Sequence, residues 1–357
     1  METEIPNEIL TQQSSILVDN SIESRKLILF SPQTTADLNR TTEKIVIDIA
    51  ACDSYYNPSQ SYIKIKGRLV GADNAAYGAN TQIALINNAP MYLFQNIDYK
   101  LGGETMETIR NPGQTTSMIG YMIYPDDFNS SAGLNQCWRK DTNVGAISAE
   151  YTASPAVAAD AAIAAGRFTP QRNANYNDGF AIRRKLLMDS DAPGEFSFIV
   201  PFSHIFGFAE YNKVLYNLRH TLTFTRGSND LPIHRANGVA AGKIVLTDIR
   251  WVIPQIIPSI EMRATLLKTV RDRTNIPIHF SSRNDEVTEV TPNARSFVWK
   301  INTSAGVEKP RWVFVGFQTS KTNTQEQNPA VFDHINMISH SLKMGSEKYP
   351  SEATLQV

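Results

Sequence analysis

Hydrophobic and polar residues alternate along most of the chain, and this pattern predicts a protein built mainly of β-strands. The clearest run is Ser61 to Val70, SYIKIKGRLV. It places Ile63, Ile65 and Leu69 on one side of an extended strand and Tyr62, Lys64, Lys66 and Arg68 on the other. An alternation of period two is the pattern of a strand with one buried face. The sequence therefore predicts a half-buried strand with a basic outer face.

The stretch from Leu85 to Arg110 predicts a hairpin around which neighbouring strands pair. Paired glycines, Gly102 and Gly103, separate two runs of strand character. Both central positions of a tight primed turn need positive φ, which glycine adopts without strain. Before the turn, Tyr92, Phe94 and Asn96 fall on one side, and Leu93, Gln95, Ile97 and Tyr99 on the other. After it, Met106 and Ile109 continue on the return strand.

Further segments fill out two sets of strands. Before Pro254, the predicted strands are residues 26–30, 44–50, 194–202, 218–226 and 243–253. After it, they are residues 275–280, 295–301, 311–318 and 335–343. Helical spacing predicts a short helix over 113–124, a single turn over 203–208 and a charged helical connector over 259–271. The Asn-, Ser-, Ala- and Gly-rich residues 125–178 predict a long loop with one small helix at 156–165.

Two prolines mark the predicted domain boundary. Proline cannot donate within a strand ladder, so Pro254 and Pro258 are expected to end the first set of strands. Many short strands with few helices are typical of β-sandwiches and barrels. The fold class is therefore all-β, with two such domains in tandem. The predicted organisation is an N-terminal arm (1–25), a first domain (26–254), a linker (255–274) and a second domain (275–357).

The amino-acid composition excludes only a few classes of protein. The chain has 357 residues, of which 42% are hydrophobic and 19% charged, as in ordinary folded proteins. A net charge of −1 provides no broad basic field for nucleic acid or anionic membranes. The two cysteines, Cys52 and Cys137, are interpreted as reduced intracellular thiols, because the acidic N-terminus lacks the apolar core of a secretory signal. No run approaches 18 apolar residues, so no membrane span is expected.

Candidate chemistry is sparse. The sequence contains none of the phosphate-binding, nucleophile-elbow or zinc-protease motifs. Of six histidines, His334 and His340 are six residues apart and would share a face of a strand. They lack nearby further ligands, so packing is the favoured interpretation over metal binding. The pairs Asp126-Asp127 and Asp189-x-Asp191 could bind a cation, but lie in turn-like sequence where Asp caps backbone amides.

Two other groups of residues have both a structural and a functional interpretation. The basic cluster Arg183-Arg184-Lys185 could contact a phosphate or an acidic neighbour, with a solvated face as the default. Three tryptophans, Trp251, Trp299 and Trp312, lie within predicted strands, whereas Trp138 does not. The three are interpreted as core or interface packing rather than as a platform for a ligand. We assign no catalytic, cofactor-binding or metal-binding residue.

Four segments together resemble one family. Residues 61–70, 87–107, 246–259 and 311–350 are similar, in order and spacing, to the double jelly-roll major capsid proteins of eukaryotic DNA viruses, especially the polinton, adintovirus and polinton-like virus group. The most specific motifs are Asn328-Pro329-Ala330 with Phe332, and Tyr349-Pro350. The resemblance implies that both domains are jelly rolls. Family members generally continue well beyond the Tyr349-Pro350 motif, and the second set of strands here holds about half the strands of an eight-stranded jelly roll. Two interpretations follow from the resemblance: the given chain is a fragment, or the second barrel is closed by something else.

The resemblance implies a structural role rather than a catalytic one. Such proteins form homotrimers of pseudo-hexagonal outline that tile an icosahedral shell, which places the chain in the virion after synthesis and assembly inside a host cell. The implied partners are other copies of the chain, neighbouring capsomers, and penton and minor capsid proteins, with no specific nucleic acid. Contact with an internal membrane is left open.

Two alternatives to a shell protein are considered. A β-sandwich binding module of the lectin or carbohydrate-binding kind would need an aromatic platform or a polar cluster for a sugar or Ca²⁺. A cupin-like hydrolase or isomerase would need paired histidines with a nearby glutamate, and the histidines here are dispersed. The oligomeric state of the purified protein separates these classes.

Overall fold

The computed structural model describes residues 20–33, 37–78, 81–142, 177–188, 193–292, 294–301, 310–349 and 355–356. Three predictions lie outside or largely outside these ranges: the helix at 156–165, most of the arm 1–25, and the pair Asp189 and Asp191. The described chain is mostly strand with few helices, so the all-β fold class is confirmed.

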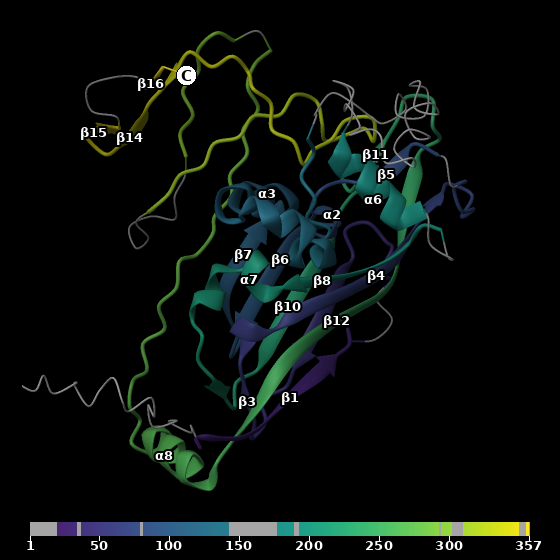
Figure 1. Cartoon of the computed structure of the whole chain (residues 1–357). Coiled ribbons are helices and arrows are strands. Elements are labelled where there is room, and N and C mark those ends of the chain that lie inside the picture. Colours follow the sequence, from purple (N-terminus) through teal and green to yellow (C-terminus); the bar gives the residue numbers. More distant parts are fainter. Residues whose placement is uncertain are drawn as a thin grey trace, which may run out of the picture.

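Two sheets form the main β unit (Figure 1). The larger has the strand order β8-β4-β12-β3-β9, with β1 also paired to β12, and the smaller has the order β2-β10-β6-β7. Tyr99 of the small sheet meets Trp251 of the large sheet edge to face, with ring centroids 6.2 Å apart. The buried apolar side chains of both sheets thus form one core between them.

The strands have the following bounds: β1 Ile22–Phe30, β2 Lys44–Ile49, β3 Tyr55–Tyr56, β4 Tyr62–Gly71, β5 Ile83–Leu85, β6 Phe94–Leu101, β7 Glu104–Arg110, β8 Glu195–Pro201, β9 Leu215–Tyr216, β10 His220–Arg226, β11 Ile233–Arg235, β12 Gly242–Pro258, β13 Ser339–His340, β14 Leu342–Met344, β15 Glu347–Tyr349 and β16 Leu355–Gln356. β5 pairs with β11, β13 with β16, and β14 with β15.

The predicted hairpin is confirmed. β6 and β7 pair around Gly102 and Gly103, whose φ angles are +61° and +98°. Ile97 and Tyr99 point into the core on the same face, as the alternation predicted, and Leu101 continues that face. Gln95, predicted on this face, is exposed, and Phe94 is buried in its place, where the pairing with β10 shifts register. The strand begins only at Phe94, because the preceding corner forms the short helix α2 (Ala89–Tyr92). β4 also follows its predicted alternation, with Ile63, Ile65 and Leu69 buried.

The prolines do not end the strand where we expected. β12 runs through Pro254 to Pro258, paired along its second half with β1, which begins at Ile22 rather than Lys26. Pro254 lies where the neighbour of β12 changes from β4 to β3, and its carbonyl accepts from the Asn57 N–H at 3.0 Å. The missing proline N–H therefore falls at a gap in the ladder, where it costs no strand pairing.

The described helices lie between the strands or after them in the chain. Those beyond α2 are α3 Pro112–Ile123, α6 Asp178–Met188, α7 Phe202–Ile205 and α8 Ile260–Arg271, with 3₁₀ turns η1 Pro58–Gln60, η2 Asp126–Ser130, η3 Ala132–Gln136 and η4 Gly207–Glu210. The predicted helices over 113–124 and 259–271 and the turn after residue 202 are confirmed. Among the described residues, no helix is both long and apolar enough to cross a membrane.

The chain beyond α8 differs from prediction. Segments 275–280, 295–301 and 311–318 have no regular secondary structure, and of 335–343 only β13 and part of β14 are strand. The strand predictions there were wrong, because alternation specifies a strand only where a second strand supplies ladder hydrogen bonds. Figure 1 shows this part running from α8 alongside the main β unit and across its top. The division into two jelly-roll domains stays a prediction.

Candidate functional site

The chain beyond α8 returns to the main β unit and docks there through buried polar side chains. One docking contact is made by residues 281–285 and the other by residues 318–333. Each is centred on a carboxylate of the main unit, Glu107 or Asp141. We call these the Glu107 contact and the Asp141 contact, and together they form the candidate functional site.

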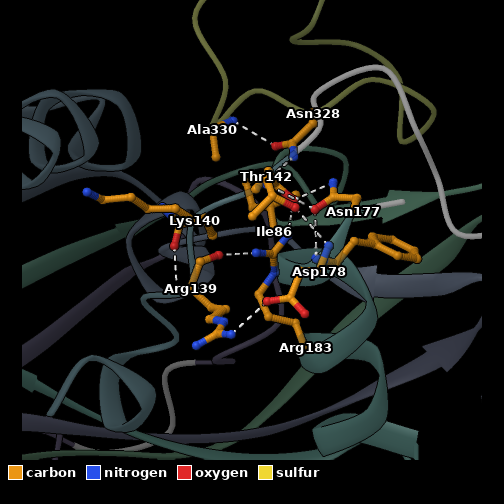
Figure 2. Close-up of polar contacts among 12 residues, drawn as sticks. Ile86, Arg139, Lys140, Thr142, Asn177, Asp178, Arg183, Asn328 and Ala330 are labelled. Carbon is orange, nitrogen blue, oxygen red and sulfur yellow. Dashed lines mark hydrogen bonds and ion pairs between the residues drawn. The ribbon is translucent and has the colours of Figure 1, made fainter. Parts of the chain in front are cut away.

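The Asp141 contact rests on a buried ion pair. The Arg183 Nη2 lies 2.7 Å from Asp141 Oδ1, and the two side chains are only 3% and 1% exposed. Arg183 also donates from Nε to the Leu85 carbonyl at 2.8 Å and from Nη1 to the Arg139 carbonyl. Figure 2 shows the guanidinium of Arg183 reaching from α6 toward these groups. The pair is thus fully hydrogen-bonded, as a buried charge pair must be.

The second oxygen of Asp141 binds the chain beyond α8. Asn328 Nδ2 donates to Asp141 Oδ2 at 2.9 Å, while Asn328 Oδ1 accepts from the Ala330 N–H at 3.0 Å. Ala330 is completely buried, and its carbonyl accepts from the Tyr121 hydroxyl at 2.9 Å. The Tyr92 hydroxyl donates to the Pro329 carbonyl at 3.0 Å. The Asn328-Pro329-Ala330 motif is therefore the part of the chain beyond α8 that binds to the main β unit here.

The same carboxylate closes the base of the long insert. Asn177 Nδ2 donates to Asp141 Oδ1 at 2.8 Å, and Asn177 Oδ1 accepts from the Thr142 N–H at 3.3 Å. Thr142 Oγ1 in turn accepts from the Asp178 N–H at 2.9 Å (Figure 2). Residues 141–142 and 177–178 are thereby held side by side. Asp141 thus connects the insert base, helix α6 and the docked chain.

The charge of Asp141 is set by two opposing effects. Burial alone would raise the pKa of its carboxyl group, but the positive charge and hydrogen bond of Arg183, with the hydrogen bond of Asn177, hold the pKa below its ordinary value. Asp141 is therefore ionised at neutral pH, and its ion pair with Arg183 persists.

The Glu107 contact uses backbone donors. Glu107 Oε1 accepts from the N–H groups of Gly207 at 3.2 Å and Arg283 at 2.8 Å, and Oε2 accepts from the Phe208 N–H at 2.9 Å. Burial raises the pKa of Glu107, and these hydrogen bonds partly offset the rise. The Arg283 guanidinium donates to the carbonyls of Ser203, His204 and Ile205 at the end of α7.

Gly207 allows the docked chain to approach the main unit closely. A Cβ at this position would lie 1.8 Å from the Ser281 carbonyl oxygen. Asn111 Nδ2 adds a hydrogen bond of 2.8 Å to Asp285 Oδ2. A backbone-to-backbone approach of this kind requires glycine, since any side chain would displace residue 281.

A third polar group holds the corner before the hairpin. Asn88 adopts a left-handed conformation with φ of +60°, and its Nδ2 donates to Thr116 Oγ1 at 2.7 Å. Its Oδ1 lies 3.0 Å from His204 Nε2, and His204 Nδ1 lies 2.7 Å from the Tyr124 hydroxyl. Burial, helped by Arg283, lowers the pKa of His204 to about 3. His204 is therefore a neutral packing residue.

Most of the sequence candidates are not brought together. Of the basic cluster, Arg183 does contact an acidic neighbour, whereas Lys185 is exposed. His334 and His340 are both exposed, and Asp126 makes only a surface pair of 3.4 Å with Lys140. No group of three potential metal-ligating side chains occurs within the described part of the chain.

The tryptophans divide between core and surface. Trp138 and Trp251 are completely buried, so core packing is confirmed for Trp251. Trp312, by contrast, is 79% exposed on the chain beyond α8. Asp141, Glu107 and Asn88 were missed at the sequence level. Of the three, only Asn88 carries a sequence signal, because it precedes Ala89-Pro90 and asparagine is one of the few non-glycine residues enriched at positive φ.

Comparison with known proteins identifies the family. The model of the double jelly roll-like domain matches residues 167–355, more than half of the chain. The chain therefore belongs to the double jelly roll-like domain family, and the resemblance found in the sequence is confirmed. No curated protein matches it.

Several solved viral structures are similar to this chain. The Sputnik virophage structure has a TM-score of 0.43 and 10% identity, covering 73% of this chain and 53% of that one. The mavirus major capsid protein has a TM-score of 0.38 and 10% identity, covering 70% and 48%. For the Faustovirus major capsid protein the values are 0.38 and 9%, covering 69% and 56%. The chain thus spans about half the length of the solved proteins it matches.

Proposed function

We propose that the protein is a structural major capsid protein, without enzymatic activity, that forms homotrimers of pseudo-hexagonal outline and tiles an icosahedral virion shell. The observation that carries the proposal is its membership of the double jelly roll-like domain family. The ordered resemblance of residues 61–70, 87–107, 246–259 and 311–350 to double jelly-roll capsid proteins supports the same conclusion.

The distribution of apolar surface favours self-association. On the chain beyond α8, Val298, Trp312 and Ile338 are 99%, 79% and 77% exposed. Contact with another copy of the chain would remove these large apolar side chains from water, which is favourable. A shell subunit needs such contacts with its trimer partners and with neighbouring capsomers. Penton and minor capsid proteins are further partners under this proposal.

The docking contacts fit the same role. A shell subunit is held by its neighbours on several sides, so distant parts of its chain must be firmly joined. The Asp141 and Glu107 contacts join such parts by buried hydrogen bonds. Polar contacts of this kind fix one geometry, because a shifted register would leave buried charges unpaired.

Light scattering on the purified chain, followed by negative-stain imaging of the main peak, tests the proposal. A trimer of hexagonal outline, or shell-like particles, is the expected result. A stable monomer over the micromolar range would point either to a truncated second barrel that cannot trimerise or to the β-sandwich binding module. A longer chain that continues past Val357 and also stays monomeric would contradict the proposal and favour the binding module. The Asp126→Ala variant, which changes only a surface pair, serves as a control for handling and should match the unaltered chain.

A further inference from the structure

Strand β1 forms an edge of the large sheet and has one open side. Among the described strands, only β12 pairs with it, from Ile22 opposite Pro258 to Phe30 opposite Trp251. Trp251 and Val252 also pair with β4, so β1 and β4 flank β12 on opposite sides. Figure 1 shows β1 next to β12 at the margin of the main β unit. Alternate N–H and C=O groups of β1 therefore point away from the sheet, where a further strand can pair with them.

The features that usually protect an edge strand lie in the first half of β1. A register shift follows Ile22, and Glu23, Arg25 and Lys26 carry charge. Bulges and charged side chains both discourage pairing with a further strand. Residues 27–30, LILF, contain neither a charge nor a proline. The second half of the edge is therefore open to pairing.

This second half is also apolar and accessible. Leu27 and Leu29 are 50% and 52% exposed, whereas Ile28 and Phe30, which alternate with them, are half-buried. Contact with a further strand would remove the two leucines from water, which is favourable. By contrast, the edge strands β8 and β7 have the turns η3 and η4 next to them.

The sequence of this half is complementary to itself in one register. Two identical antiparallel strands are related by a two-fold axis, so each contact occurs twice. An axis at Arg25 or Lys26 would place like charges face to face, which is unfavourable. An axis at Ile28 places Leu27 of each copy opposite Leu29 of the other. We propose that β1 pairs with β1 of a second copy of the chain in this register, so that two large sheets become one continuous sheet.

The remaining pairs of this register are compatible with it. Lys26 lies opposite Phe30 of the other copy, so no like charges face each other over residues 26–30. With the axis at Leu27 instead, Leu29 would lie opposite Arg25 and would lose its apolar partner. The Ile28 register is thus the one that gives both exposed leucines an apolar neighbour.

The contact goes beyond the trimer of the proposed function. A two-fold contact lies away from a threefold axis, so in a shell it would join one capsomer to the next. The paired stretch is short and buries less than the roughly 1,200 Å² of a standard interface. A single contact is therefore weak, and it becomes strong where many copies are held together.

Disulfide trapping between two variants of the full chain tests the register. Both variants carry Cys52→Ser, because Cys52 is exposed and Cys137 is buried. One also carries Leu27→Cys at natural isotope abundance, and the other carries Leu29→Cys with ¹⁵N labelling. Directly opposite residues of an antiparallel pair have Cα atoms about 4.5–5.5 Å apart, within reach of a disulfide. After mild oxidation of the mixture, mixed-isotope dimers should be the main disulfide-linked product.

The products within one isotope provide the comparison. Leu27 of one copy is only diagonal to Leu27 of the other, about 7–8 Å away, which is too far for an unstrained disulfide. A statistical distribution over the three products, or the absence of disulfide-linked dimers, would overturn the proposal. Ile22→Cys, at a similarly exposed position (49%), replaces Leu27→Cys in the control mixture and should give no excess of mixed dimers.

Sedimentation equilibrium measures the contact without introduced cysteines. Leu27→Lys with Leu29→Lys places lysines face to face and removes the leucine contacts of both copies. The dissociation constant of the two-fold contact should rise at least about tenfold. Leu186→Lys, at a 60% exposed leucine of α6, is the matched control and should leave the constant unchanged. Equal constants for the two variants would contradict the proposal.

The β1 contact and the proposed capsid function can fail separately. Trimers that give no disulfide between positions 27 and 29 would overturn the β1 contact and leave the capsid proposal in place. Dimers linked through β1 without any trimer would support the β1 contact and count against the capsid proposal.

Discussion

Replacing Asp141 with alanine removes the carboxylate that joins helix α6, the insert base and the docked chain. Arg183, 3% exposed, would keep its charge without a counterion, and Asn177 and Asn328 would each lose an acceptor. Breaking a buried pair by removing one partner costs about 3–5 kcal/mol. For a protein of ordinary stability, about 5–15 kcal/mol, that is a large share of the free energy of unfolding.

Denaturant unfolding followed by tryptophan fluorescence measures this change. The Asp141→Ala variant should unfold at clearly lower denaturant concentration than the unaltered chain, and Asp126→Ala, which removes an exposed carboxylate, should change little. The double variant Asp141→Ala/Arg183→Met should recover part of the loss, because it no longer buries an unpaired charge. A loss of less than about 1 kcal/mol in the single variant would refute the reasoning, since it would mean that water reaches Arg183.

The effect of Asp141 should depend on pH in a known direction. Its pKa in the folded chain is below the ordinary value of 3.8. The stabilisation from the ion pair is therefore complete above about pH 4 and is lost as the pH falls through the folded pKa. The difference between Asp141→Ala and the unaltered chain should accordingly be largest at neutral pH and shrink in strong acid.

Three further predictions concern the other contacts. Gly207→Ala should displace residues 281–285, seen as faster amide hydrogen exchange at Arg283, whereas Gly78→Ala should not, because a Cβ there would make only an ordinary contact, 3.7 Å from Thr81 Oγ1. Glu107→Gln should destabilise the fold by about 1–3 kcal/mol in thermal unfolding, because an amide NH₂ would face a backbone N–H; an unchanged Tm would contradict that geometry. Burial lowers the pKa of His204 to about 3 and the pKa values of His220 and His234 to about 4, so the unfolded chain binds protons that the folded chain excludes. Stability should fall as the pH drops from about 6.5 toward 4, and less steeply in His204→Gln; a flat profile over this range would show that these histidines are accessible to protons.

Local patterns were sufficient for the strands and turns of the main β unit. Gly102 and Gly103 marked the hairpin, and the alternation around Ile63 and Ile65 gave the correct buried face of β4. These features depend on neighbours within a few residues, so they can be read from a short window of sequence. Helix α3 was found for the same reason, although its buried residues are mostly small or polar, such as Thr116, Ser117 and Gly120.

The candidate site could not be found in the same way. Asp141 meets Asn328 across 187 positions of sequence, and Glu107 meets the Arg283 N–H across 176. Neither carboxylate lies in a motif, and each is distinguished only by burial and by the partners that the fold brings to it. The basic cluster at Arg183 was noticed, but the sequence did not show which of its residues would turn inward.

By itself, the sequence determined the all-β class, the central hairpin, the basic face of β4 and the family resemblance. Each follows from side-chain periodicity, from glycine conformation, or from short motifs that occur in the same order as in the family. The tertiary structure alone decided that β12 continues through Pro254 and that segments 295–301 and 311–318 lack strand partners. It also decided which carboxylates hold the docked chain. Strand pairing and the burial of charge depend on residues distant in sequence, and only the folded chain brings these together.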